Sequence, residues 1–333
     1  MTKISEEEIR PAQLMKDKQK CVDHDRNYLL DRKDQWVETN CPACSCSVSK
    51  SYGDKAGFAY VECVECRTIY TNPRPSLELL HDFYSQSQNY AYWNKHIFPS
   101  TESVRRDRIF APRAKRLADY CQRFGLSGGT LFEVGAAFGT FCGEVEKLQL
   151  FDEIVALEPT AELAETCRQR GFRVEEKFIE QIEETEIADV VAAFEVLEHL
   201  FSPKDFLENC SRILKPGGLV ILSCPNGRGF DNAVLKTKSG SFDHEHVNYF
   251  NPQSLSLLVQ RCGLETLDVM TPGRLDAELV RKQFLDGQIE LSDQPFLNEI
   301  LNVRWSELGE KFQDFLADHC LSSHLWIVAR KPV

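Results

Sequence analysis

Short apolar runs alternate with helical stretches through the second half of the chain. Four apolar runs have the composition of buried strands: Leu131–Val134, Glu153–Glu158, Ala188–Phe194 and Leu219–Pro225. Val174 begins a further strand, the third in chain order, so that the last two runs are the fourth and fifth, and the segments between the strands have helical periodicity. Strands and helices that alternate at this spacing predict right-handed βαβ units around a parallel sheet. We therefore expect a doubly wound α/β domain over residues 126–333.

The first of these strands runs into a turn of small residues at Gly135, Ala137 and Gly139. Small residues let the backbone approach a ligand without Cβ collisions, and doubly wound domains bind ligands at the carboxyl ends of their strands. Glu158 ends the second strand about 20 residues further on, where a carboxylate can hold a ribose diol. The pattern predicts a nucleotide-like ligand at this edge.

Two cofactor motifs compete for this turn. The dinucleotide fingerprint G-x-G-x-x-G/A starts at Gly135 but meets Thr140 at its third small position. The pattern E/D-x-G-x-G-x-G of S-adenosylmethionine methyltransferases matches from Glu133 to Gly139, with Ala137 in place of one glycine. The second motif fits better.

The order of LFEVGAAFGTF, VALEP, FEVLEHL and ILKPGGLVILSCPN resembles the class I methyltransferase family over about residues 125–333. The resemblance implies a Rossmann-like seven-stranded sheet whose last strand is antiparallel, with a helical insertion at about residues 274–321 before that strand. It implies S-adenosylmethionine as cofactor, with Glu133 near the ammonium, Glu158 on the ribose and Phe178 to Glu180 beside the adenine. The expected cofactor-binding residues are Glu133, Gly135, Ala137, Gly139, Glu158, Phe178, Ile179, Phe194 and Glu195.

Two C-x-x-C pairs precede this domain, Cys41-Pro-Ala-Cys44 and Cys63-Val-Glu-Cys66. Pairs separated by a strand-forming segment have the ligand spacing of a small zinc ribbon. Four protein ligands close the coordination sphere, so we expect this zinc to be structural. The alternatives are four unligated cysteines or a redox dithiol, and Cys46 is a spare thiol that competes for the ion.

The rest of the chain divides around these two units. Residues 1–40 form a polar N-terminal arm with no sustained period, residues 41–75 the ribbon and residues 76–125 a helical linker. The linker carries aromatic residues and arginines that either pack and face solvent or line the ligand cleft and grip an anionic substrate. They are Tyr84, Tyr90, Tyr92, Trp93, Arg105, Arg106, Arg108, Arg113 and Arg116.

Composition narrows the partners. The net charge of −12 weighs against a nucleic-acid partner. The N-terminal segment is charged, and no apolar run approaches the roughly 20 residues that span a bilayer, so we expect a cytoplasmic protein without a membrane partner. In that compartment the thirteen cysteines are not expected to form disulfides.

The methyl acceptor is expected near the segment Ser241-Phe-Asp-His-Glu-His-Val-Asn-Tyr-Phe250, which follows the fifth strand. It resembles the H-E-H-x-x-Y-F motif of sugar C-methyltransferases, in which a histidine and a tyrosine are implicated in deprotonation. On this basis His244, His246 and Tyr249 are the expected catalytic residues. The alternatives are a loop held by hydrogen bonds, and a second metal on H-x-H, for which no third ligand is evident. His199 either contacts ligand or caps the backbone.

The sequence therefore predicts methyl transfer to oxygen or carbon of a small polar acceptor, such as a nucleotide-linked sugar. Those sugar enzymes commonly carry a further C-terminal domain that this chain is too short to hold, and zinc-ribbon methyltransferases of surface-glycan and specialised-metabolite clusters are a closer resemblance. An RNA methyltransferase that uses the ribbon for binding is an alternative, but the fourth strand ends in Phe194-Glu-Val-Leu rather than N/D-P-P-Y. A non-catalytic cofactor-binding scaffold is the third possibility. The sequence leaves the oligomeric state open.

Overall fold

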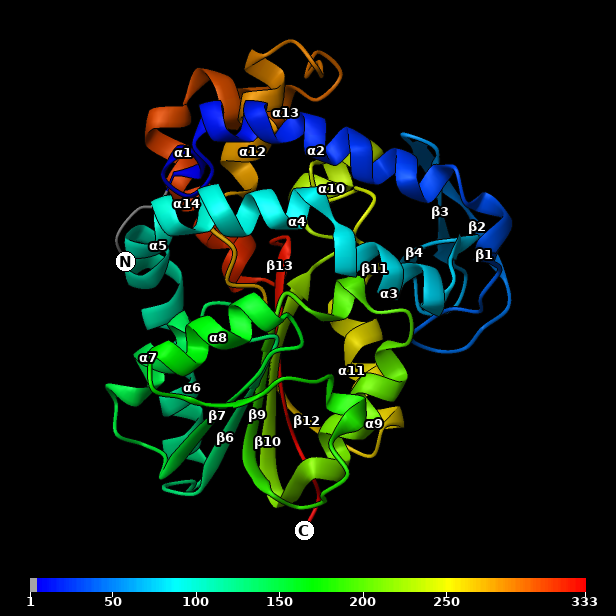
Figure 1. Ribbon diagram of the computed structural model, residues 1–333. Helices are drawn as coiled ribbons and strands as arrows, with labels where there is room; N and C mark the ends of the chain where they lie inside the picture. Colours follow the sequence, from blue (N-terminus) through cyan, green and yellow to red (C-terminus); the bar gives the residue numbers. More distant parts are fainter. Residues whose placement is uncertain (1–4) are drawn as a thin grey trace.

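A seven-stranded sheet forms the centre of the computed structural model, which describes residues 5–333 (Figure 1). The strand order is β12-β13-β10-β9-β6-β7-β8, and β13 runs antiparallel to both neighbours while the other pairs are parallel. The strands are β6 (Thr130–Val134), β7 (Glu153–Leu157), β8 (Arg173–Glu175), β9 (Ala188–Phe194), β10 (Leu214–Pro225), β12 (Glu265–Met270) and β13 (His324–Arg330). The predicted α/β fold with an antiparallel last strand is confirmed.

Helices cover both faces of this sheet because its strands are apolar on both sides. Val190 and Ala192 pack under the first helical layer, and Val191 and Ala193 under the second. The first layer holds α6 (Ala111–Arg123), α7 (Thr140–Glu146) and α8 (Ala161–Gln169), and the second holds α9 (Pro203–Ile213) and α11 (Pro252–Arg261) (Figure 1). One strand boundary differs from the prediction. The strand expected to begin at Leu219 begins at Leu214 as β10, and its pairing with β9 is irregular between these two residues.

A second sheet connects the cysteine pairs to the main domain, with strand order β11-β4-β3-β2. Its strands are β2 (Ser49–Lys55), β3 (Phe58–Cys63), β4 (Ile69–Thr71) and β11 (Asn248–Tyr249). β11 belongs to the segment that follows β10, and Asn248 pairs with Tyr70 and Tyr249 with Ile69. The segment expected to form the acceptor loop thus contributes the strand β11 to the sheet of the ribbon, and the sequence did not indicate this pairing. Beside it lie η1 (Lys33–Gln35) and the paired strands β1 (Trp36–Val37) and β5 (Arg74–Pro75).

The N-terminal arm is more ordered than expected. Residues 1–4 of the arm lie outside the described residues, but α1 (Glu6–Ile9) is followed by the 19-residue helix α2 (Ala12–Leu30). Figure 1 shows α2 crossing above the carboxyl ends of the strands, and it packs against α4 (Gln88–Tyr92). An arm with little regular structure was expected because its sequence has no sustained period. The helix escaped that prediction because α2 buries only Asp25 and Leu29, too few positions to give an apolar period.

The linker is helical, as predicted. It comprises α3 (Leu77–Gln86), α4, η2 (Trp93–Ile97), α5 (Phe98–Arg105), η3 (Arg106–Phe110) and α6. The insertion comprises α12 (Asp276–Leu285), α13 (Pro295–Asn298), η7 (Glu299–Val303) and α14 (Trp305–Asp318), around a separate core that includes Val280 and Leu301. The short elements η4 (Ile179–Gln181), η5 (Leu197–His199), α10 (Phe230–Leu235) and η6 (Lys236–Lys238) complete the chain. Every helix in the described part of the chain is too short or too polar to cross a membrane.

Candidate active site

The turn after β6 has an unusual backbone. Gly135, Ala137 and Gly139 all have positive φ angles, of 74°, 49° and 66°. A Cβ at Gly135 would lie 3.0 Å from Cγ2 of Val196, so the turn is closely packed there. Ala137 adopts a left-handed conformation that costs a non-glycine residue about 1 kcal/mol. The backbone path is therefore the one that the glycine motif predicts, with local strain at its alanine.

Glu158 holds this turn from the end of β7. Its side chain is 2% exposed, Oε2 accepts a hydrogen bond from the N–H of Ala137 at 2.8 Å, and Oε1 accepts one from the N–H of Thr160 at 2.9 Å. Thr160 is the residue before α8, and its side chain makes no capping hydrogen bond to that helix. Burial raises the pKa of Glu158. Each carboxylate oxygen keeps a lone pair for a ligand hydroxyl, so the residue fits a ribose diol.

Glu133 is the second buried carboxylate of the turn. Its Oε2 accepts hydrogen bonds from the N–H and the thiol of Cys142, at 3.2 and 2.9 Å. Burial raises its pKa to about 8, against the opposing effects of Cys142 and the charge of Arg113. A cation bound beside it would favour the ionised form. The residue therefore fits the ammonium group of an amino-acid ligand.

The expected adenine side lies beyond β8. Ile179 is buried, whereas Phe178 is 47% exposed and its ring stacks on His81 at 5.4 Å. At the end of β9 the ring of Phe194 packs between Phe141 and Trp326, at 4.7 and 5.1 Å, which leaves its backbone to face a ligand. Phe178 is thus the accessible aromatic ring of the predicted cofactor residues.

Glu195 stands at the centre of the carboxyl edge, with a positive φ of 57°. Its carboxylate accepts a hydrogen bond from the Ser223 hydroxyl at 2.6 Å and lies 3.3 Å from Arg113 and 3.5 Å from His324. Although burial raises it, the charges of His324 and Arg113 hold the pKa of Glu195 below its ordinary value. One linker arginine therefore reaches the site.

Two linker tyrosines also reach the edge. The Tyr84 hydroxyl lies 3.0 Å from Nδ1 of His199 and donates to the carbonyl of Glu245 at 3.2 Å. Burial raises the pKa of Tyr90, and the charges of Glu158 and Glu245 add to the effect. These contacts favour the interpretation that the linker lines the cleft.

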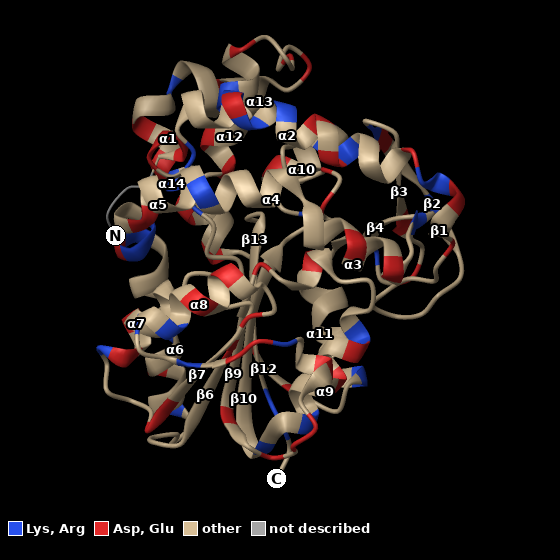
Figure 2. Cartoon of the chain, in the orientation of Figure 1, with Lys and Arg blue, Asp and Glu red and all other residues tan. Residues whose placement is uncertain are grey.

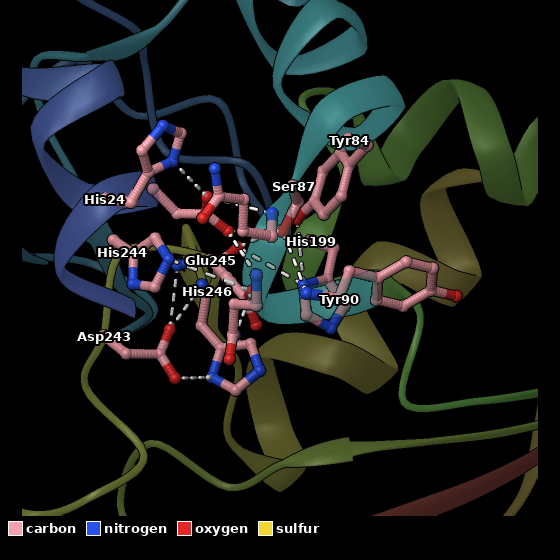
Figure 3. A network of polar contacts seen from close by, with 12 residues as sticks. His24, Tyr84, Ser87, Tyr90, His199, Asp243, His244, Glu245 and His246 are labelled. Carbon is pink, nitrogen blue, oxygen red and sulfur yellow. Dashed lines mark hydrogen bonds and ion pairs between the residues drawn. The ribbon is translucent and has the colours of Figure 1, made fainter. Parts of the chain in front are cut away.

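The acceptor loop is folded around Asp243 (Figure 3). Its Oδ1 accepts the N–H groups of Glu245 and His246, both at 2.9 Å. The His246 Nδ1 donates to the carbonyl of Ser241 at 2.9 Å and lies 3.3 Å from Oδ2 of Asp243. Burial lowers the pKa of His246, but the charges of Asp243 and Glu198 outweigh it and raise that pKa to about 9. The Nδ1 contact leaves Nε2 of this ring free.

The end of β9 faces His246. The rings of His199 and His246 are 4.7 Å apart, and burial together with the charge of His246 lowers the pKa of His199 to about 3. Glu198 is 1% exposed, and its Oε2 has no hydrogen-bond partner among residues 5–333. Burial and the charge of Glu195 raise its pKa to about 8. Glu198 was not predicted as a site residue, although it lies in the motif FEVLEHL.

The other two predicted catalytic residues do not join this group. Tyr249 is fully buried, and its hydroxyl lies 3.0 Å from the carbonyl of His246 and 3.1 Å from that of Ser241, so it holds the loop. His244 is 5% exposed, packs edge-on against Phe83 at 5.8 Å, and points toward α2 (Figure 3). Of the three, only His246 presents a free ring nitrogen to the edge.

Asp25 of α2 supports the loop from the far side. Its Oδ2 accepts from the Ser87 hydroxyl at 2.6 Å and from the N–H of Asn89 at 2.8 Å, and its Oδ1 accepts from the N–H of Gln88 at 3.0 Å. The Asn89 amide in turn donates to Oε1 of Glu245 at 2.6 Å. This connection between the arm and the loop has no sequence signal, because its members are far apart in the chain.

The cysteine pairs converge as their spacing predicts. The sulfur atoms of Cys41, Cys44, Cys63 and Cys66 all lie within 4.8 Å of one another. The shortest separations, Cys41–Cys66 and Cys44–Cys63, are 3.4 Å, too long for a disulfide and close to the roughly 3.8 Å of a tetrahedral tetrathiolate zinc site. Cys46 hydrogen-bonds to Val48 instead. The four sulfurs fit a zinc ion.

The seven-stranded sheet with its antiparallel last strand is the Rossmann-like fold of class I methyltransferases. Residues 105–269 match a family model described as a methyltransferase domain. The matched residues run from the end of α5 to β12 and include the cofactor turn and the acceptor loop.

Named relatives agree at this level. A ubiquinone biosynthesis O-methyltransferase of Maricaulis maris is 33% identical over 120 residues, which are 32% of this chain and 46% of that protein. One from Xanthomonas oryzae is 29% identical over 171 residues, 46% of this chain and 70% of that protein. The chain thus spans less than half the length of the first relative. A solved complex of the Haloferax volcanii Trm112 methyltransferase activator and its proposed methyltransferase shares the fold, with a TM-score of 0.50 and 15% identity over 72% of this chain and 96% of that chain.

Proposed function

We propose that this protein transfers a methyl group from S-adenosylmethionine to an oxygen or carbon of a small polar acceptor. One observation carries the proposal. The carboxyl edge of the sheet holds a cofactor turn with two buried carboxylates, Glu133 and Glu158, and the acceptor loop holds His246, whose Nδ1 contact leaves Nε2 for a substrate. A donor site beside a group that accepts protons is the arrangement that methylation of an alcohol or carbon acid requires.

The cofactor residues have separable roles. When bound, S-adenosylmethionine supplies an electrophilic methyl group on a sulfonium. Glu158 would accept hydrogen bonds from its ribose hydroxyls, Glu133 would orient its ammonium, and the turn from Gly135 to Gly139 would lie against its amino-acid part. The exposed ring of Phe178 covers the adenine.

His246 supplies the proton acceptor on the acceptor side. Its Nδ1–H is fixed by the carbonyl of Ser241, which directs Nε2 away from the loop. Because the pKa of His246 is raised to about 9, the ring accepts a proton only in its neutral form, which becomes more populated as the pH rises toward 9. Tyr249 and Asp243 keep the loop in this shape. Tyr249 is thereby a positioning residue in this proposal, and His244 packs behind the loop.

The acceptor class has two supports. The curated relatives are named for ubiquinone biosynthesis, which points to a phenolic oxygen. The loop from Asp243 to Phe250 resembles that of sugar C-methyltransferases, which points to a nucleotide-linked sugar. A nucleic-acid acceptor has less support: Figure 2 shows basic and acidic residues interspersed on the outer elements, and β4 of the ribbon is occupied in pairing with β11.

We further propose that Cys41, Cys44, Cys63 and Cys66 hold a structural zinc ion. The ion would fix the end of β3 and the approach to β4, and β4 pairs with β11 of the acceptor loop. The Tyr60 hydroxyl of β3 also donates to the carbonyl of Asp243 at 2.9 Å. The ribbon thus shapes the acceptor site from a distance.

The test is turnover of isotopically labelled S-adenosylmethionine with a panel of phenols and nucleotide sugars, in parallel with structured RNA. We expect label in a small-molecule product and none in RNA. The wild type and His319→Ala, which changes an exposed histidine of the insertion, should be equally active, and Glu158→Ala should be inactive at low cofactor concentration. Cofactor binding without turnover on any acceptor would instead identify a cofactor-binding scaffold.

A further inference from the structure

The group of Glu198, His199 and His246 has the composition of a metal site. One carboxylate oxygen and one nitrogen of each ring all lie within 4.8 Å of one another. No ion pair of 4.0 Å or less joins Glu198 to either histidine among the described residues, so the three groups are near one another without a direct contact between the carboxylate and a ring. Ligand atoms bound to one zinc ion lie about 3.3 Å apart, which a small inward rotation of these side chains would reach.

Both imidazoles are oriented as metal ligands usually are. Nδ1 of His246 donates to the carbonyl of Ser241 at 2.9 Å. Nδ1 of His199 lies 3.0 Å from the Tyr84 hydroxyl and 3.3 Å from the carbonyl of Glu245 (Figure 3). In protein metal sites the nitrogen that does not bind metal makes this kind of contact, which fixes the tautomer and leaves Nε2 as the ligand.

The third ligand has no other partner. Glu198 is 1% exposed and its Oε2 lacks a hydrogen bond within residues 5–333, an expensive state for a buried oxygen. The carboxylates of Glu195 and Asp243 also act on this group and favour a cation, whereas the charges of Arg113 and, near Asp243, of Lys18 oppose it. Since His199 and His246 are partly exposed, an ion is accessible from the cleft and keeps open positions for a substrate.

A second cluster of similar composition shows the contrast. Asp25, His244 and Glu245 also lie within 4.8 Å of one another. There, however, both oxygens of Asp25 accept hydrogen bonds from the start of α4, and Glu245 accepts one from Asn89. The carboxylates of that cluster are thus satisfied by the protein, although Nε2 of His244 has no hydrogen-bond partner among residues 5–333, whereas at the end of β9 it is the carboxylate Glu198 that lacks one.

We propose that Glu198, His199 and His246 bind one divalent transition-metal ion at the acceptor site. Two imidazoles and a carboxylate suit Zn²⁺, Fe²⁺, Co²⁺ or Mn²⁺ and occupy one side of the ion. The open side faces the cleft and takes oxygens of the acceptor. The ion lowers the pKa of a bound hydroxyl, whose proton then passes to solvent, so His246 acts as a ligand when the ion is present. The role of the ion, though not its presence, rests on the proposed function.

The test counts metal on the full-length protein, without an affinity tag and without S-adenosylmethionine. Zn²⁺, Co²⁺ or Mn²⁺ is titrated and bound metal is measured after desalting. We expect two equivalents in the wild type and in His319→Ala, and one, the ribbon zinc, in Glu198→Gln and His246→Gln. Tyr84→Phe, which removes one contact to His199, should weaken the second equivalent by about tenfold.

Each outcome is decisive. A wild type that binds one equivalent of every metal overturns the proposal, as does a second equivalent that Glu198→Gln and His246→Gln both retain. If Glu198→Gln fails to fold, His199→Gln replaces it, and retention of the ribbon zinc reports folding. A wild type that binds one equivalent of metal and still methylates an acceptor would contradict the second metal site and leave the proposed function unaffected. A wild type that binds two equivalents of metal but methylates no acceptor would support the metal site and contradict the proposed function.

Discussion

The cofactor half and the acceptor half of the carboxyl edge are built in different ways. The cofactor half comes from one continuous βαβ segment, in which Glu133 and Glu158 lie 25 positions apart on neighbouring strands. The acceptor half joins α2, α4, η5 and the loop before β11, with Asp25 and Asn89 at one side and Glu198 and His246 at the other. One half depends on local chain geometry and the other on long-range packing, so the two should fail under different perturbations.

The largest expected difference follows removal of the ribbon metal. Structural zinc sites contribute on the order of 10 kcal/mol to the folding of small domains, and the ribbon's β4 holds the acceptor loop through β11. A strong chelator, or Cys63→Ser, should abolish turnover and lower the melting temperature. Cofactor affinity should stay within about twofold, because the turn is distant from the ribbon. Zinc analysis, calorimetry with cofactor and turnover measure the three effects.

This contrast can fail in two informative ways. If the cofactor affinity falls in parallel with turnover, the two halves form one cooperative unit. If the isolated protein contains no zinc and is active, the cysteine cluster has another role. Cys46→Ser is the matched control, since Cys46 lies beside the cluster without joining it, and it should keep both activities.

His246→Gln should give the largest effect confined to the acceptor half. Loss of a positioned proton acceptor costs about 10²- to 10⁴-fold in rate, and loss of a ligand to an acidifying ion acts in the same direction. Because His246 does not contact the cofactor turn, the dissociation constant of S-adenosylmethionine should not change. Steady-state kinetics beside calorimetry measures both quantities, with His319→Ala as the control. Turnover within twofold of wild type would place deprotonation elsewhere.

Glu158→Ala should give the converse pattern. The variant removes a buried carboxylate that can hold two ribose hydroxyls, and hydrogen bonds to charged groups contribute about 1.5–3 kcal/mol each. Cofactor affinity should therefore fall by about 100-fold or more, while the metal and acceptor groups remain. The control is Glu162→Ala, an exposed carboxylate in the first turn of α8. An unchanged dissociation constant in calorimetry would remove Glu158 from the cofactor site.

The two halves also differ in how far their sequence revealed them. The turn at Gly135 and the carboxylate at Glu158 were predictable because strand, turn and helix fix their positions locally. His246 was predicted together with His244 and Tyr249, but a loop has no period that says which side chains face the cleft. The pairing of Tyr249 with Ile69 determines which side chains of the loop face the site, and no pattern in the sequence predicts this pairing.

Other acceptor-side residues had weaker signals still. Asp25 lies in a helix that buries only one apolar residue, Leu29, so its own burial could be found only in three dimensions. Glu198 lies beside His199 in a recognised motif, yet its role depends on the ring of His246, which comes from a loop 48 positions later in the chain. Residues that act through packing of distant segments leave no local pattern.

A pH effect tests the cofactor half alone. Burial raises the pKa of Glu133 to about 8, so the folded protein holds this carboxyl neutral at pH 7. A group with a raised folded pKa gives its full contribution to stability below its unfolded pKa and loses it as pH rises toward 8. The melting temperature of the free protein should therefore fall between pH 5 and pH 8, and Glu133→Gln should reduce that slope. Equal slopes would mean that Glu133 is ionised without ligand.

The smallest expected effect concerns the strain in the cofactor turn. Ala137 has a φ of +49°, which glycine adopts without penalty, so Ala137→Gly should raise the free energy of unfolding by up to about 1 kcal/mol. Ala136→Gly is the matched control: Ala136 itself has no positive φ, so the same change there should destabilise by about 0.5–1 kcal/mol. Denaturant unfolding measures both. Opposite signs would show that this turn stores strain at one residue, whereas equal destabilisation would mean that the Ala137 methyl packs well enough to offset its backbone conformation.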